Sequence, residues 1–167
     1  MEPLYPIESR ESPREILEAD FKQLRGGIPI RGGWGYSMED ACIIDKNDPI
    51  VDQSLPFDWV GLERVFVEKR IYEEMIIFRS KGEQFSGIKW DLQKQSLHRE
   101  DARIFDKLVF EITAFADADW EELRTEFEGP HGYGQPGFDL AAHERKRQDK
   151  VVRITREFWF DITSFHN

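Results

Sequence analysis

Cysteine is almost absent from this sequence. Cys42 is the only one in 167 residues, so no disulfide can form within the chain and a reducing compartment is the expected setting. The first residues lack the basic segment and apolar run of a signal peptide. No stretch reaches the roughly 18 consecutive apolar residues of a membrane span. We therefore predict a cytoplasmic protein that does not bind membranes.

Positive charge is also scarce. The sequence has 23 lysines and arginines against 33 aspartates and glutamates, a net charge of −10. Nucleic-acid phosphates are bound by clustered cations, and the one basic run, at 145–147, lies in a chain whose overall charge repels them. We therefore predict no nucleic-acid binding.

The charge is unevenly distributed along the chain. Residues 111–128 contain seven acidic side chains and one basic, whereas residues 144–156 contain six basic and two acidic. The two segments can face each other in the fold, or the acidic one can offer a surface to a basic protein. The sequence leaves both interpretations open.

Motifs for metal binding and catalysis are missing. There is no Cys-x-x-Cys, His-Glu-x-x-His or Gly-x-Ser-x-Gly pattern, and Cys42 has apolar neighbours that suit a buried side chain. Asp139 and His143 are four residues apart, but such a pair on a helix is more often surface than ligand. We predict no metal and no cofactor. The four histidines are scattered over the chain, as His98, His131, His143 and His166.

A strand over 151–163 is the clearest element that is present. Apolar and polar residues alternate along it, and Arg156 interrupts the apolar side, where its stem can lie on apolar surface while its head reaches water or a carboxylate. The predicted buried side consists of Val152, Ile154, Phe158, Phe160 and Ile162.

Further elements fit around this strand. Alternation predicts strands over 87–95 and 107–115, joined as a hairpin by a long polar connection. Capping boxes predict helices over 13–25, from Ser12, and over 120–128, from Asp119. Residues 60–78 fit a helix or a strand, and length favours a helix. We predict a single α+β domain over 1–167, with a mostly antiparallel, twisted sheet and helices packed on one face.

Two loops rich in glycine and aromatic residues are the candidate ligand site. Glycine allows close backbone approach, aromatic rings give flat contact area, and Arg31 or His131 can hold an anion or move a proton. An alternative is that both loops are turns whose aromatic rings pack into the core. The candidate ligand-binding residues are Arg31, Trp34, Tyr36, His131 and Tyr133.

Two functions are compatible with these features. The first is a non-enzymatic protein-binding component, such as an inhibitor, immunity-type protein or adaptor, that binds a basic protein. The second is a small-molecule-binding protein or hydrolytic enzyme with its site between loops 31–36 and 131–138. The sequence alone does not decide between these two functions, and it does not determine the oligomeric state. The candidate partner-binding residues are Glu121, Glu122, Glu126 and Glu128.

Overall fold

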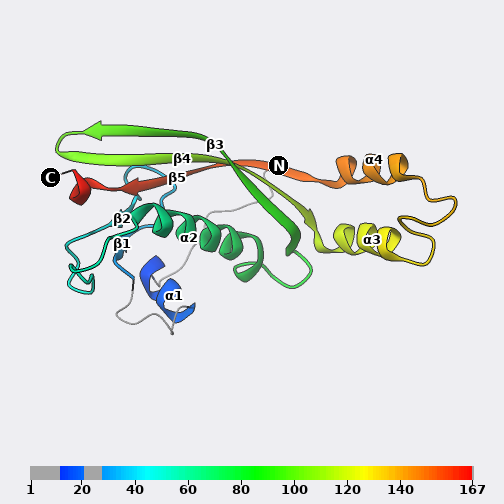
Figure 1. Cartoon of the computed structure of the whole chain (residues 1–167), viewed down its shortest axis with the longest axis horizontal. Helices are drawn as coiled ribbons and strands as arrows, with labels where there is room; N and C mark the ends of the chain where they lie inside the picture. Colours follow the sequence, from blue (N-terminus) through cyan, green and yellow to red (C-terminus); the bar gives the residue numbers. More distant parts are fainter. Residues whose placement is uncertain (1–11, 21–27, 167) are drawn as a thin grey trace.

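A five-stranded sheet organises the protein (Figure 1), and the computed structural model describes residues 12–20 and 28–166. The strands are β1 (Ile30–Gly32), β2 (Cys42–Ile44), β3 (Phe85–Glu100), β4 (Arg103–Ala116) and β5 (Val152–Asp161), in the spatial order β1-β2-β5-β4-β3. The β2–β5 pair is parallel and the other pairs are antiparallel. The predicted α+β architecture with a mostly antiparallel sheet is confirmed.

The alternation in β5 places its two faces as predicted. Ile154, Phe158 and Phe160 are buried on the side that faces the helices. Trp159 is buried on the opposite side, because the loop after β1 covers this end of the strand and the Trp159 N–H donates to the Gly35 carbonyl at 2.8 Å. The alternation of apolar and polar residues in the sequence does not predict that this loop buries Trp159.

The β3–β4 hairpin is longer and tighter than predicted. The expected long polar connection is wrong: His98 and Glu100 belong to β3, and Glu100 pairs directly with Arg103. Asp101 takes the turn at a φ of 53°, a conformation that aspartate tolerates better than most residues. An edge strand buries little, so polar residues can continue it without cost.

Helices α1 (Pro13–Asp20) and α2 (Trp59–Tyr72) cover one face of the sheet (Figure 1). The predicted capping box of α1 is present: the Glu15 N–H donates to Ser12 Oγ, and the Ser12 N–H donates to a Glu15 carboxylate oxygen. Residues 21–25 of the predicted helix lie outside the described residues. The helix favoured for 60–78 is confirmed, and it ends in a π-helical turn, η1 (Glu73–Ile77).

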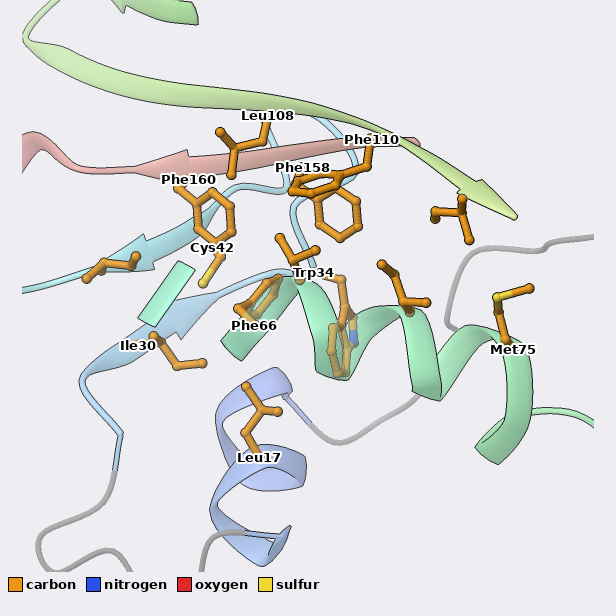
Figure 2. Packing of buried hydrophobic residues seen from close by; sticks show 14 of the residues in the cluster. Leu17, Ile30, Trp34, Cys42, Phe66, Met75, Leu108, Phe110, Phe158 and Phe160 are labelled. Atoms are coloured by element: carbon orange, nitrogen blue, oxygen red, sulfur yellow. The ribbon is translucent and has the colours of Figure 1, made fainter. Parts of the chain in front are cut away.

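The core lies between these helices and the sheet. Leu17 of α1, Phe66 of α2 and Phe158 of β5 converge there, with Trp34 from the loop after β1 beside them (Figure 2). Rings of Trp34 and Phe66 are 5.7 Å apart, and those of Phe66 and Phe160 are 5.4 Å apart and nearly perpendicular. Aromatic pairs at these separations add stability beyond their buried area.

Helices α3 (Asp117–Glu128) and α4 (Leu140–Lys150) form an arm that extends past the end of the sheet (Figure 1). The predicted cap at Asp119 is wrong, because α3 begins three residues earlier than predicted, directly after β4, with Ala116 in the cap position. The first turn of α3 contacts the sheet through Trp120, whose ring is 5.4 Å from that of Phe115. The chain closes with a short 3₁₀ turn, η2 (Thr163–Phe165). Among the described residues no helix has the length and apolar character needed to cross a bilayer.

Candidate functional site

The loop after β1 is clamped between α2 and β5. Gly35 has a φ of +79°, and a Cβ on it would lie 2.8 Å from the Trp159 carbonyl oxygen, so this close approach requires glycine. Trp34 is buried against Phe66, whereas Arg31 is 65% exposed. Of the candidate ligand residues on this loop, only Arg31 is largely open to solvent.

Tyr36 reaches a buried ionic network on α2. Its hydroxyl donates to Glu74 Oε1 at 2.6 Å, and the same oxygen accepts from Arg70 Nε at 3.0 Å. Arg70 is fully buried, donates to the Trp34 carbonyl at 3.1 Å, and lies between two ring faces, 3.9 Å from Tyr36 and 3.8 Å from Phe158. Burial lowers the pKa of Arg70, and the neighbouring Glu74 carboxylate opposes this effect.

Arg156 completes the network from β5. Its Nε lies 3.6 Å from the second carboxylate oxygen of Glu74, so of the two expected environments for its head, water or a carboxylate, it contacts the carboxylate. Glu74 lies in the π-helical turn that extends α2, and such turns are frequent at functional sites. Arg70 and Glu74 are sealed from solvent, so in this conformation the network fixes α2 against the sheet and holds no ligand.

A second buried polar pair involves Glu63, which precedes Arg70 on α2. Glu63 of α2 and Asp106 of β4 are almost fully buried, and Asp106 also accepts from Gln95 Nε2 at 2.8 Å. Burial, followed by the charge of Asp106 and a hydrogen bond to it, raises the pKa of Glu63 to about 9. Among the described residues, neither Glu63 Oε2 nor Asp106 Oδ1 has a hydrogen-bond partner, and a proton on Glu63 would supply the donor that the pair lacks.

Cys42 lies close to this pair. Its side chain is fully buried in the core, and burial, with Glu63 and Asp40 nearby, raises the pKa of the thiol well above its ordinary value. A buried, protonated thiol is a poor nucleophile. The predicted role of Cys42 as a small buried side chain is confirmed by its position in the core.

The second predicted loop lies far from the first. Residues 131–138 connect α3 to α4 at the tip of the arm, whereas residues 31–36 lie against the sheet near β1 (Figure 1). The expected shared pocket of Arg31, Trp34 and Tyr36 with His131 and Tyr133 is therefore not formed. Both loops have the composition of a site, but one is held by the core and the other by the helical arm.

The tip of the arm is an aromatic cluster. Tyr133 stacks on Phe127 with the rings 4.9 Å apart and nearly parallel, while Phe138 and His143 contact the same Phe127 ring. Tyr133 is nevertheless 61% exposed, and His131 is exposed beside it. Each of these two candidate ligand residues therefore faces solvent, without a described cavity between them.

The four candidate partner-binding glutamates all lie on α3. Glu126 faces α4, where it contacts Lys146 Nζ at 2.6 Å and His143 Nδ1 at 3.3 Å. These two contacts, Lys146 first, lower the pKa of Glu126. Glu121 and Glu128 are exposed and pair with Arg124, and Glu122 is exposed as well. The acidic and basic segments thus face each other along one side of α3 and leave three glutamates outside.

A polar hollow of about 470 Å³ lies beside β1 and the end of β5. Arg31 and Arg103 both line it, and each has an acidic neighbour: Asp45 lies 3.7 Å from Arg31, and Asp161 lies 2.9 Å from Arg103. Burial raises the pKa of Asp161, but hydrogen bonds from Thr163 and Arg103 outweigh it and the net shift is downward. The hollow therefore presents two cations and two anions.

An apolar hollow of about 500 Å³ lies between α2 and the loop that precedes it. Leu55, Phe57 and Leu62 line it, with Asp58 at its rim. Asp58 is already engaged as the cap of α2, since its carboxylate accepts from the Gly61 N–H at 2.8 Å. The hollow offers apolar surface and no unengaged catalytic group in the described residues.

Metal ligands do not converge in the part of the chain that the structure describes. Asp139 caps α4 by accepting from the Ala142 N–H at 3.0 Å, and His143 points to Phe127 and Glu126. This segment forms α4, and its Asp–His pair serves packing and capping.

Five residues of the buried polar groups and the polar hollow were not predicted from the sequence: Arg70, Glu74, Glu63, Asp106 and Arg103. A signal for the first three exists: residues 63, 67, 70 and 74 have helical spacing, and all are buried along α2 and its continuation η1. Comparison of the chain with protein-family models, with curated proteins and with solved structures found no match.

Proposed function

We propose that this protein is a non-enzymatic binding component, of the inhibitor, immunity or adaptor kind, that binds a basic protein through the α3–α4 arm. The observation that carries the proposal is the position of the arm, which extends past the sheet and contacts it mainly at its base (Figure 1). Faces that cover no core are available to a partner.

The charge of the arm selects a basic partner. Helix α3 carries six carboxylates and one arginine. Glu126 is occupied by α4, but Glu121, Glu122 and Glu128 face outward, and their pairs with Arg124 are exposed. Exposed ion pairs contribute little stability, so a lysine or arginine of a partner can replace Arg124 at small cost.

The tip supplies an anchor for the same surface. Tyr133 stacks on Phe127 on one side and is largely exposed to solvent, and Leu140 is exposed at the start of α4. Rigid aromatic side chains within polar surroundings are typical binding hot spots. The proposed interface thus combines an acidic rim with an aromatic centre.

Affinity capture at low and high salt tests this proposal. A basic partner captured by the wild type should be lost with Glu121→Gln/Glu122→Gln and with Tyr133→Ser, and it should be released by salt. The control is Glu39→Gln/Glu83→Gln, which makes the same charge change at exposed positions outside the arm. Equal capture by both double variants would contradict the proposal.

A second candidate function uses the polar hollow beside Arg31. No hydrogen bond of the Arg31 guanidinium to a described residue is present. Arg103 Nε donates to one oxygen of Asp161 at 3.0 Å, and Nη2 lies 2.9 Å from the same oxygen. Both arginines therefore keep donors for a small anion such as a phosphate or a carboxylate. In an NMR titration, inorganic phosphate should shift the backbone amide signals of Arg31 and Arg103. The variant Arg31→Gln should abolish this shift, and the control variant Lys46→Gln should preserve it. If phosphate leaves the signals of these two amides unchanged, the hollow does not bind phosphate.

A further inference from the structure

The outer edge of β3 is the longest unpaired strand edge in the described part of the chain. β3 has 16 residues and lies last in the sheet order, with β4 on one side only. Its backbone N–H and C=O groups on the other side are open to another strand. Beside this edge, on the face that carries α2, Leu92 and Leu97 are 49% and 57% exposed.

We propose that β3 pairs antiparallel with β3 of a second copy of this chain, about a two-fold axis at Gln95. The result is a closed dimer with one continuous ten-stranded sheet, because each copy contributes five strands. The opposite edge of each sheet is β1, which has only three residues and offers little for further growth.

The β-bulge in β3 is compatible with this symmetry. The pairing of β3 with β4 skips a residue between Leu92 and Lys94, so Gln93 falls out of the alternation and the residues on either side keep their faces. When Gln93 is skipped in both copies, Gln95 lies opposite Gln95 and Lys94 opposite Ser96. Every pair then joins side chains on the same face of the combined sheet.

This register pairs complementary side chains along the whole edge. Lys89 lies opposite Glu100 of the other copy, Asp91 opposite His98, and Leu92 opposite Leu97, and the two-fold axis repeats each pair. Opposite charges and apolar residues in directly opposed positions stabilise strand pairs. The two exposed leucines of each copy cover those of the other.

Neighbouring registers are disfavoured by charge. An axis at Lys94 places Lys94 opposite itself, and an axis at Ser96 places Asp91 opposite Glu100. Like charges directly opposed destabilise a strand pair. Of these three registers, only the one centred on Gln95 avoids such a pair.

The charge pattern of β3 is that of an edge strand that pairs with a copy of itself, and not that of one whose charges prevent self-association. Edge strands that avoid self-association commonly carry charges of one sign, lysine above all, or proline. On the face away from α2, β3 alternates in sign through Lys89, Asp91, Lys94 and Glu100. Such a strand attracts an antiparallel copy of itself.

Sedimentation equilibrium with a charge-swap cycle tests the dimer and its register. Lys89→Glu and Glu100→Lys should each raise the dimer dissociation constant roughly tenfold, since each creates two like-charge pairs. The double variant should return to within about twofold of the wild type, because the swapped charges again attract. Lys81→Glu and Glu83→Lys are matched controls, with the same charge changes at exposed loop positions.

Each outcome decides the proposal. Circular dichroism first establishes that every variant is folded, which is expected because Lys89 and Glu100 are exposed. A wild-type chain that stays monomeric at all concentrations overturns the dimer. A double variant that stays as weak as the single ones overturns the register, and controls that weaken the dimer equally overturn the specific edge contact.

Discussion

Glu63 of α2 and Asp106 of β4 are both almost fully buried, and the charge of Asp106 adds to the effect of burial on Glu63, so the Glu63 carboxyl group favours its protonated form. This proton links the stability of the fold to pH. Burial raises the pKa of Glu63 from an ordinary value near 4.5 to about 9. Between these two values the unfolded chain has released the proton while the native protein keeps it. The contribution of Glu63 is therefore fully present below pH 4.5 and is lost as the pH rises to about 9.

Glu63→Gln should remove this dependence. Glutamine stays neutral at every pH and can donate an N–H to Asp106. We expect the wild type to lose stability relative to the variant from pH 5 to pH 9, with a slope of at most about 1.4 kcal/mol per pH unit. Urea unfolding of both proteins across this range measures the difference. Glu83→Gln, at an exposed position, is the control, and parallel profiles for the wild type and Glu63→Gln would show that Glu63 is not protonated in the fold.

Arg70→Met should be strongly destabilising. The change leaves the sealed carboxylate of Glu74 without its closest cation, and breaking a buried ion pair from one side costs about 3–5 kcal/mol. The double variant Arg70→Met/Glu74→Gln should recover part of this loss, because it removes the stranded charge. Arg64→Met, at an exposed position on the same helix, should change the unfolding free energy by about 0.5 kcal/mol or less. An Arg70→Met protein as stable as Arg64→Met would refute the importance of the network.

These buried charges explain why α2 was the hardest element to predict. The buried residues of α2 and η1 include Glu63, Arg70 and Glu74 as well as Phe66 and Ile71, so polar and apolar residues do not separate into two faces. The strands were predictable because β4 and β5 keep a period of two over their inner face. The length of the segment was enough to predict that α2 is a helix. The residues that pair with its buried charges could not be predicted.

The candidate ligand site could not be predicted for a different reason. Glycine and aromatic content describes a loop locally and contains no information on its distance from another loop. Arg31 and His131 belong to loops with similar composition, yet one loop leads into β2 and the other joins the helices of the arm. The separation depends on the arm, whose projection follows from α3 continuing directly from β4.

Gly35→Ala should cost more than the backbone conformation alone explains. Gly35 and Gly82 both have positive φ, 79° and 96°, but a Cβ at Gly35 would meet the Trp159 backbone while one at Gly82 meets nothing within 4 Å. Gly82→Ala therefore isolates the conformational penalty. We expect Gly35→Ala to be about 1–3 kcal/mol more destabilising than Gly82→Ala in urea unfolding. Equal losses would mean that the loop after β1 can move away from β5.

His143→Ala should loosen the arm and leave the sheet unchanged. The His143 ring is buried between Phe127 at 5.3 Å and Phe138 at 5.8 Å, and it joins α4 to α3 through Glu126. Its loss removes packing inside the arm, which opens locally because its helices contact the sheet mainly at their base. Hydrogen exchange should become faster at the amides of α3 and α4 and stay the same in β4 and β5. Glu144→Ala, at the exposed neighbouring position, should alter neither. Faster exchange throughout the sheet would instead show that the arm and the sheet unfold as one unit. The arm would then be as rigid as the core.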